Sequence, residues 1–212
     1  MSDSINKKLD LLFEEWEPLC PDPFVRDGVV CEETFRREAR RVVFVLAEPN
    51  YIEAVKAAGN DLRVFYRTVV SGRCFYQSLA RWTRLLLDGQ TVSFKGNPEG
   101  ACAQLRRIAT INLKKVGGAG SAVGGTVAAF AAEHCSLLVK QLDIIQPDVI
   151  VVCGGHARAG IPKVLGAPKT RTPDVAAIWK RLRLLPSHHP SCWTKPEAAL
   201  DARLRDAWEA TR

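Results

Sequence analysis

The chain has 212 residues, 47% of them hydrophobic and 25% charged, a composition typical of a folded globular protein. No apolar run approaches the ~20 residues of a membrane-spanning helix, and acidic groups throughout residues 1–20 argue against a signal or transit peptide. We therefore expect a cytoplasmic protein without a membrane partner, folded as a single domain over residues 1–212.

Charge and cysteine content narrow the classes of partner. Thirty lysines and arginines against 23 aspartates and glutamates give a net charge of +7. This balance favours a polyanionic partner, because phosphate neutralisation supplies most non-specific nucleic-acid affinity; the alternative is a merely basic protein. The seven cysteines form no Cys-x-x-Cys pair, which disfavours zinc or iron–sulfur ligation. We expect reduced thiols, no metal and no cofactor.

The first 40 residues are expected to form a helical extension packed on the domain. Apolar residues at positions 9, 11, 12, 13 and 16 have helical spacing, and the prolines at 21 and 23 end the helix.

Beyond residue 40, apolar strands alternate with helices. The apolar run at residues 42–46 has no polar alternation, which is typical of a strand buried on both faces; further strands are expected at residues 108–115, 148–155 (ending in a glycine pair) and 182–186. Helices are expected at residues 51–58, 74–87, 101–107, 126–145, 156–165 (broken early by Gly160 and Pro162) and from 195 onward, with a minor strand at 175–179. This order predicts an α/β fold, a three-layer α/β/α sandwich around a central four-stranded, mainly parallel sheet.

Polar residues follow the carboxyl ends of all four strands. In an open parallel sheet that edge binds ligands, so we expect one cleft formed by Glu48 and Asn50, Asn112 and Lys114, Gly154 and His156, and His188 and His189. Imidazole can donate, accept or shuttle a proton near neutral pH, which makes the two adjacent histidines candidates for chemistry.

In this order the motifs resemble the uracil-DNA glycosylase superfamily. Residues 46–50 (Leu-Ala-Glu-Pro-Asn) stand where the family has Gly-x-x-Pro-Gly or Gly-x-Asp-Pro-Tyr. Asn112 ends a strand as the family's base-reading asparagine does, and residues 189–193 (His-Pro-Ser-Cys-Trp) match its His-Pro-Ser motif followed by a wedge residue. The resemblance spans residues 40–195. It implies hydrolysis of the N-glycosidic bond of a flipped-out damaged or modified pyrimidine in single- or double-stranded DNA, leaving an abasic site.

The resemblance also implies roles for individual residues. Glu48 would stabilise the cationic sugar or orient water, and His189 would donate to the carbonyl of the departing base. Base contacts fall to Asn50, Asn112 and Phe75, with Tyr76 as the alternative to Phe75, although an aromatic residue on that helix also suits a core position. The resemblance assigns DNA contacts to Lys114, Lys115, Lys169, Arg171, Ser187 and Ser191, with Trp193 as the wedge. The alternatives without a function are that the lysines and the arginine are ordinary solvated charges and that the tryptophan only packs against the protein. His188 and His156 are expected to be structural.

The chain departs from the family pattern in its first motif. Leu46 replaces the usual glycine, and Glu48 replaces aspartate, asparagine or alanine. Asn50 stands where a tyrosine blocks substituents at C5 of the pyrimidine. The pocket is therefore predicted to admit larger 5-substituted bases, including the hypermodified cytosines of some phages, so that repair and antiviral defence both stay open.

Two other classes of function compete with this hypothesis. A nucleic-acid-binding protein could keep the fold without the reaction. An unrelated α/β hydrolase or nucleotide-binding enzyme is disfavoured, because the chain has no Gly-x-Ser-x-Gly elbow, no P-loop and no Gly-x-Gly-x-x-Gly. We expect a monomer.

Overall fold

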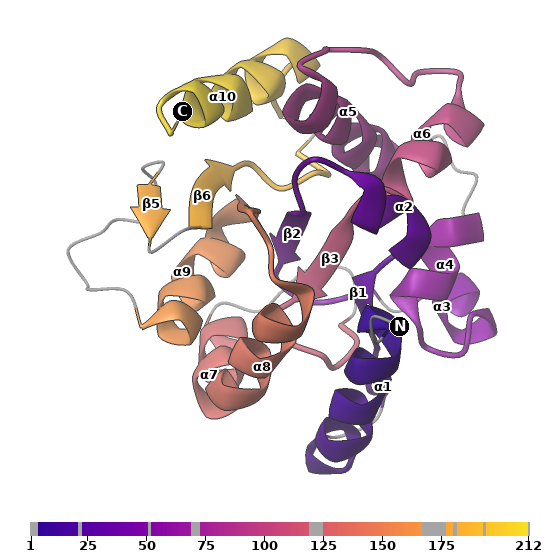
Figure 1. The fold of residues 1–212 in the computed structure, drawn as a ribbon, viewed down its shortest axis with the longest axis vertical. Coiled ribbons are helices and arrows are strands. Elements are labelled where there is room, and N and C mark those ends of the chain that lie inside the picture. The colour runs from indigo at the N-terminus through magenta and orange to yellow at the C-terminus, as the bar shows by residue number, and fades with distance from the viewer. Residues whose placement is uncertain are drawn as a thin grey trace.

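The computed structural model describes residues 4–20, 23–50, 52–68, 73–118, 125–166, 177–179 (backbone only), 182–192 and 194–211. In this part of the chain a central sheet is flanked by helices (Figure 1).

The sheet has six strands in the order β1-β3-β2-β4-β6-β5, which corrects the expected number of four. Its centre consists of four strands that are parallel to their neighbours: β3 (Ala109–Asn112), β2 (Val42–Leu46), β4 (Val149–Cys153) and β6 (Leu182–Ser187). Each edge adds one antiparallel strand, β1 (Gly28–Val29) or β5 (Ala177–Trp179). With two residues, β1 is too short to show a periodic pattern in the sequence; β5 is the expected minor strand.

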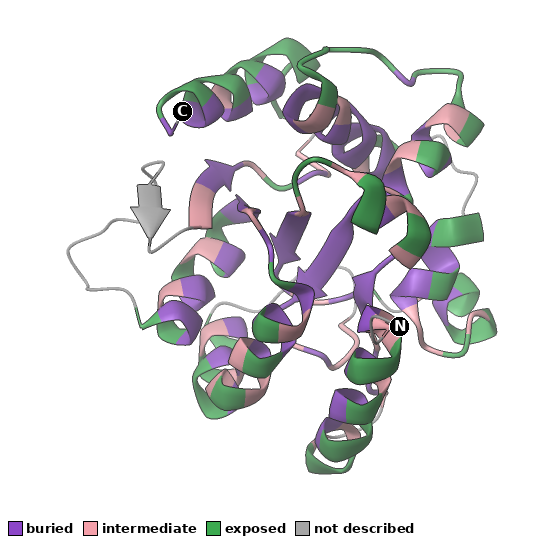
Figure 2. Ribbon diagram, viewed as in Figure 1, coloured by how far each residue is buried: buried purple, intermediate pink, exposed green. Residues whose placement is uncertain are grey.

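The strands bury both of their faces. Val43 and Val45 of β2 belong to one apolar core and Phe44 to the other, because successive side chains of a strand point to opposite faces. The first core is shared with α1 (Ile5–Trp16), α7 (Thr126–Glu133), α8 (Cys135–Ile145) and α9 (Gly154–Leu165). The second is shared with α3 (Glu53–Ala57), α4 (Leu62–Thr68), α5 (Cys74–Asp88), α6 (Pro98–Leu105) and α10 (Glu197–Glu209). The chain is therefore an α/β protein with helices on both faces of the sheet, and Figure 2 shows buried strands inside helices whose outer faces are exposed.

The N-terminal 40 residues are part of the sheet and not only a helical extension. After α1 come a short 3-10 helix (Glu17–Leu19), edge strand β1 and α2 (Glu32–Arg37). Pairing of Gly28 with Thr110 joins β1 to β3. The N-terminal segment therefore adds an edge strand to the sheet, next to β3, which ends in Asn112.

Two helix predictions need correction, both for reasons of tertiary packing. The helix expected over residues 126–145 is interrupted at His134, whose ring is buried against Trp16 and Phe130. Helix α9 does not break at Gly160 or Pro162 but continues to Leu165. A β-carbon at position 160 would lie 2.6 Å from Leu113 Cδ1, so glycine lets this helix pack closely on the segment after β3. Packing thus outweighs the hydrogen bond that proline removes.

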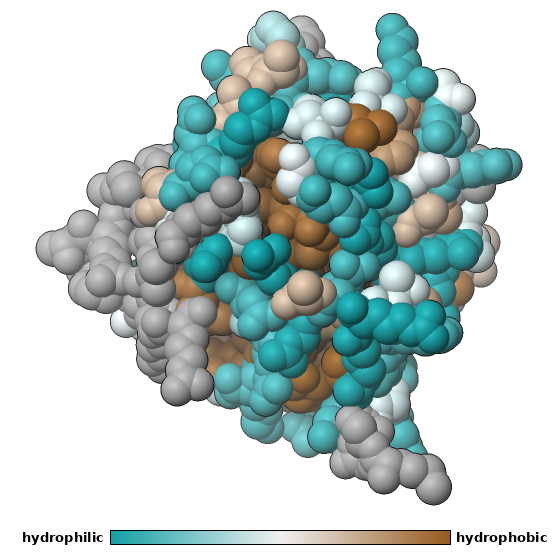
Figure 3. All heavy atoms as spheres, turned by 45° about the horizontal axis from the view of Figure 1, so that its top comes forward, coloured by the Kyte–Doolittle hydropathy of each residue, from teal (hydrophilic) through white to brown (hydrophobic). Residues whose placement is uncertain are grey.

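Most of the surface in Figure 3 is hydrophilic, and apolar residues are visible in a central hollow. In the described part of the chain no helix is long and apolar enough to cross a bilayer.

Candidate functional site

A cavity of about 580 Å³ opens at the carboxyl ends of the central parallel strands. Several elements contribute its walls, namely the segments after β2 and β6, the end of β3, the start of α9, and helices α3, α4 and α5. The predicted site residues that line it are Glu48, Asn50, Phe75, Asn112, His189 and Ser191. The expectation of one cleft at this edge is met in part: the cavity brings together residues up to 143 positions apart (48 to 191), but Lys114 and His188 do not line it.

Glu48 is held at the end of β2 by two close contacts. Its Oε2 accepts a hydrogen bond from Lys114 Nζ at 2.7 Å, and the side chains are 9% (Glu48) and 22% (Lys114) exposed. On the other side, a β-carbon at Gly118 would overlap the Glu48 carboxylate. Glycine at position 118 thus allows the backbone to approach the carboxylate, and the Glu48 charge has a cationic partner in Lys114, which does not itself line the cavity.

Asn112 lies in the interior wall of the cavity and is 1% exposed. Its backbone N–H and its Nδ2 both donate to Asp27 Oδ2, at 2.7 and 3.3 Å. Its Oδ1 has no hydrogen-bond partner among the described residues. A buried acceptor without a partner is uncommon in proteins, so this atom is a candidate for contact with a ligand.

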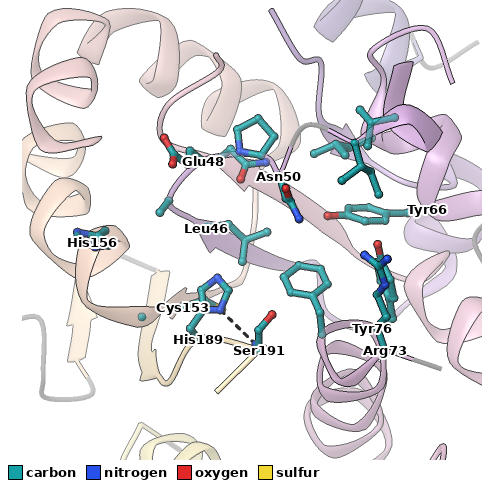
Figure 4. Close-up of a pocket in the computed structure, with 18 of the residues that line it drawn as sticks. Leu46, Glu48, Asn50, Tyr66, Arg73, Tyr76, Cys153, His156, His189 and Ser191 are labelled. Atoms are coloured by element: carbon teal, nitrogen blue, oxygen red, sulfur yellow. Dashed lines mark hydrogen bonds between the residues drawn. The ribbon is translucent and has the colours of Figure 1, made fainter. Parts of the chain in front are cut away.

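His189 faces the cavity in a defined tautomer. The backbone N–H of Ser191 donates to His189 Nδ1 at 3.2 Å (Figure 4), so the neutral ring carries its proton on Nε2. Burial lowers the pKa of His189 below its usual 6.5, and the nearby His156 lowers this pKa further. Part of the residue stays exposed to solvent, and the centre of its ring lies 6.1 Å from that of Phe75. His189 is therefore a neutral N–H donor at neutral pH.

The first turn of α9 borders the same cavity beside His189. Gly154 has a φ of +83°, and a β-carbon there would lie 3.2 Å from His189 Cβ, so glycine is needed for both conformation and space. Gly155 and His156 also line the cavity, and no described side chain caps this helix start. The N–H groups of a first helical turn lack partners in the helix, which suits them to an anion.

Aromatic side chains of α4 and α5 form the opposite wall, and of these Tyr76 was a candidate from the sequence whereas Phe65 and Tyr66 were not. Tyr66 and Tyr76 pack edge to face at 6.1 Å, and Phe65 contacts both. Figure 4 shows the Tyr66 hydroxyl pointing into the cavity, as does the amide of Asn50. Burial raises the pKa of Tyr66 well above its usual 10, so this hydroxyl stays protonated. The apolar spacing of residues 62–66 is a helical signal that could have drawn attention to this wall.

Two of the predicted DNA contacts are wrong. The Lys115 side chain is 0% exposed and its Nζ lies 2.6 Å from Asp27 Oδ1, so it cannot meet a phosphate at the surface. Ser187 is also 0% exposed and does not border the cavity. Lys114 stays partly exposed but is paired with Glu48. Lys169, Arg171 and Trp193 lie outside the described residues. His188 is half-buried and does not line the cavity.

The described residues contain no group of three or more histidine, cysteine, aspartate or glutamate side chains arranged to hold a metal ion. Comparison of the chain with known proteins adds no family assignment: no protein-family model matches it, and no curated protein matches its sequence.

Proposed function

We propose that the protein is a DNA glycosylase that hydrolyses the N-glycosidic bond of a pyrimidine flipped into the cavity, with a fold like that of the uracil-DNA glycosylase superfamily. The observation that carries the proposal is His189, a neutral histidine whose Nε2–H is available at a cavity also lined by Glu48 and Asn112. These residues belong to the motifs of the resemblance.

His189 would act on the departing base. Cleavage of the N-glycosidic bond leaves the bonding electrons on the base, and the negative charge is shared with its carbonyl oxygens. A hydrogen bond from Nε2–H strengthens as that charge grows, which lowers the barrier by preorganised electrostatics. A neutral imidazole suits this role because it donates the bond while keeping its proton.

Glu48 would act on the sugar. The deoxyribose becomes cationic as the bond breaks, and a nearby carboxylate can stabilise it or orient the attacking water. The ion pair with Lys114 keeps one carboxylate oxygen, Oε2, in place. The same ion pair reduces the net negative charge at the site, which favours water orientation over direct charge stabilisation.

The cavity supports a base larger than uracil as a substrate. Its volume of about 580 Å³ lies in the range of sites for drug-sized ligands and exceeds the needs of one pyrimidine ring. The short, exposed Asn50 leaves space where a tyrosine would stand. We therefore include 5-substituted pyrimidines, among them the hypermodified bases of phages, in the proposed substrate class.

Base release from a panel of oligonucleotides tests the proposal. The panel carries uracil, 5-hydroxymethylcytosine or its glucosylated form, in single and double strands. His189→Ala should lower the rate of base release by about 10²–10³, the usual cost of losing one such donor, and Glu48→Gln should abolish release. His188→Ala is the matched control and should keep the wild-type rate within about threefold, because His188 does not line the cavity.

The pH dependence provides an independent reading of His189. A lowered pKa means that the ring is still neutral when the pH falls below 6.5, so base release should persist there. An acid limb centred above pH 6.5 would contradict the role of His189. Binding of DNA without release of any base would instead favour the alternative, a nucleic-acid-binding protein that keeps the fold without the reaction.

A further inference from the structure

We propose that Asp27, a residue of the N-terminal segment, is a positioning residue that makes Asn112 present its Oδ1 to the cavity, so that the site selects bases with an N–H donor on the edge facing Asn112. This inference rests on the proposed function and goes beyond it by naming what orients the base-reading side chain.

The orientation of the Asn112 amide follows from hydrogen-bond chemistry. An asparagine can usually turn its amide oxygen and nitrogen end for end, because both ends find partners. An ionised carboxylate only accepts hydrogen bonds. Since Asp27 Oδ2 lies 3.3 Å from one end of the Asn112 amide, that end must be the nitrogen, and Oδ1 must be the end without a protein partner.

The Asp27 carboxylate is itself held rigidly. Its Oδ1 accepts from Lys115 Nζ at 2.6 Å and from Gln141 Nε2 at 2.7 Å, and its Oδ2 accepts from the backbone and side chain of Asn112. Asp27, Lys115 and Gln141 are all 0% exposed. Four donors around one carboxylate hold it in a fixed orientation, and the hydrogen bonds to Asn112 fix the orientation of the Asn112 amide in turn.

The fold explains how this carboxylate reaches the site. Gly28 pairs with Thr110 in the antiparallel contact between β1 and β3, which puts Asp27 beside the end of β3. Lys115 arrives from the segment after β3 and Gln141 from α8. The edge strand thus connects an N-terminal segment to the interior wall of the cavity.

The chemical consequence concerns the base. The N3–H of uracil and the 4-amino group of cytosine can each donate to Oδ1, and substituents at C5 do not alter either donor. Pyrimidin-2-one has the same ring and O2 carbonyl without any N–H donor at this edge, and it is no larger than uracil. Binding it would leave Oδ1 without a partner, a cost that sites built around a hydrogen bond impose on analogues lacking it.

A binding experiment tests the inference. DNA carries uracil or pyrimidin-2-one on a 2′-fluorinated sugar, which resists cleavage because fluorine destabilises the cationic sugar, and the dissociation constants are measured by fluorescence anisotropy. Wild type should bind the uracil DNA at least about tenfold more tightly. Asp27→Asn, which can donate to Asn112 and let its amide turn, should reduce this preference to less than about threefold.

The matched control is Asp201→Asn, which weakens a second buried ion pair, between Asp201 and Arg81, away from the cavity. It should lower stability yet keep the tenfold preference. Equal affinity of wild type for the two DNAs, or a preference unchanged in folded Asp27→Asn, would overturn the inference. Neither result touches the proposed function, which depends on base release.

If Asp27→Asn does not fold, the double variant Asp27→Asn with Lys115→Gln removes both buried charges and should show the same loss of preference. If neither variant folds, hydrogen exchange of the Asn112 side-chain amide in wild type decides. Its Nδ2–H bonded to Asp27 should be protected, and exchange as fast as that of an exposed asparagine would overturn the inference.

Discussion

Among the residues that the structure describes, Asp27 and Asp201 are buried carboxylates paired with cations, and their surroundings differ. Asp27 joins β1, β3 and α8, and one of its partners, Asn112, lines the cavity. Asp201 of α10 accepts from Arg81 and from Trp82 Nε1 of α5, so it ties two helices together. A buried ion pair alone is weak evidence of function. What distinguishes Asp27 is that a residue it orients reaches the candidate site.

The largest expected effect comes from removing Asp27. Asp27→Ala leaves the fully buried Lys115 ammonium without its carboxylate, and breaking such a pair costs about 3–5 kcal/mol of unfolding free energy. Urea unfolding followed by circular dichroism measures the loss. A loss below about 1 kcal/mol would show that water reaches Lys115. It would contradict the conclusion that Asp27 is held rigidly by its partners.

Asp201→Ala is expected to cost less, about 3 kcal/mol, at the lower end of the range for a broken buried pair. Arg81 keeps a second partner, because Glu197 lies 3.1 Å from its Nη1 and is half exposed. The same urea titration compares the two alanine variants directly. A greater loss for Asp201→Ala than for Asp27→Ala would reverse the order of the two sites.

The third test is the pH dependence of the unfolding free energy, through Glu32, a carboxylate nearer the surface than Asp27 and Asp201. Burial alone raises the pKa of Glu32, but hydrogen bonds from Ser4 and from the backbone N–H groups of Ile5 and Asn6 outweigh it and lower this pKa from 4.5 to about 2. Glu32 therefore stabilises the fold fully above pH 4.5. Because the side chain is partly solvated, we discount this contribution to about 2 kcal/mol, and it is lost as the pH falls from 4.5 to 2.

The control for this acid effect is Glu32→Gln, which has no carboxyl group to titrate at position 32. The difference in unfolding free energy between wild type and this variant should shrink between pH 4.5 and pH 2. A difference that stays constant over this range would refute the role of Glu32.

The smallest effect on stability is expected at the ion pair between Lys114 and Glu48, of which only Glu48 lines the cavity. Lys114→Met should change the unfolding free energy by less than about 1 kcal/mol, because Lys114 is partly exposed. The Lys114→Met variant should nevertheless release the base more slowly than wild type, because the Glu48 carboxylate loses the hydrogen-bond donor that holds it in place. Stability from urea unfolding and the release rate are measured on the same preparation, and equal rates with and without Lys114 would separate this ion pair from the activity.

Local patterns predicted a large part of the cavity. Glu48, Asn112 and His189 each lie at or just after the end of a largely apolar strand, and parallel strands bring their carboxyl ends to one edge. Lys115 was misjudged because it looks like Lys114 in the sequence, although neighbouring residues point in different directions and only one of them meets solvent. Asp27 carried no signal, since a single aspartate before a two-residue strand has no periodicity to reveal its burial.

By itself the sequence determined the four parallel strands, the helices that alternate with them, and the edge of the sheet at which polar residues gather, because strand and helix periodicity are local properties. The tertiary structure alone decided the edge pairing of β1, the interruption at His134, the burial of Lys115 and the contact of Asp27 with Asn112. Those features depend on which distant segments pack together. The free energy of burying a charge is set by the partners that packing supplies, and no local pattern contains it.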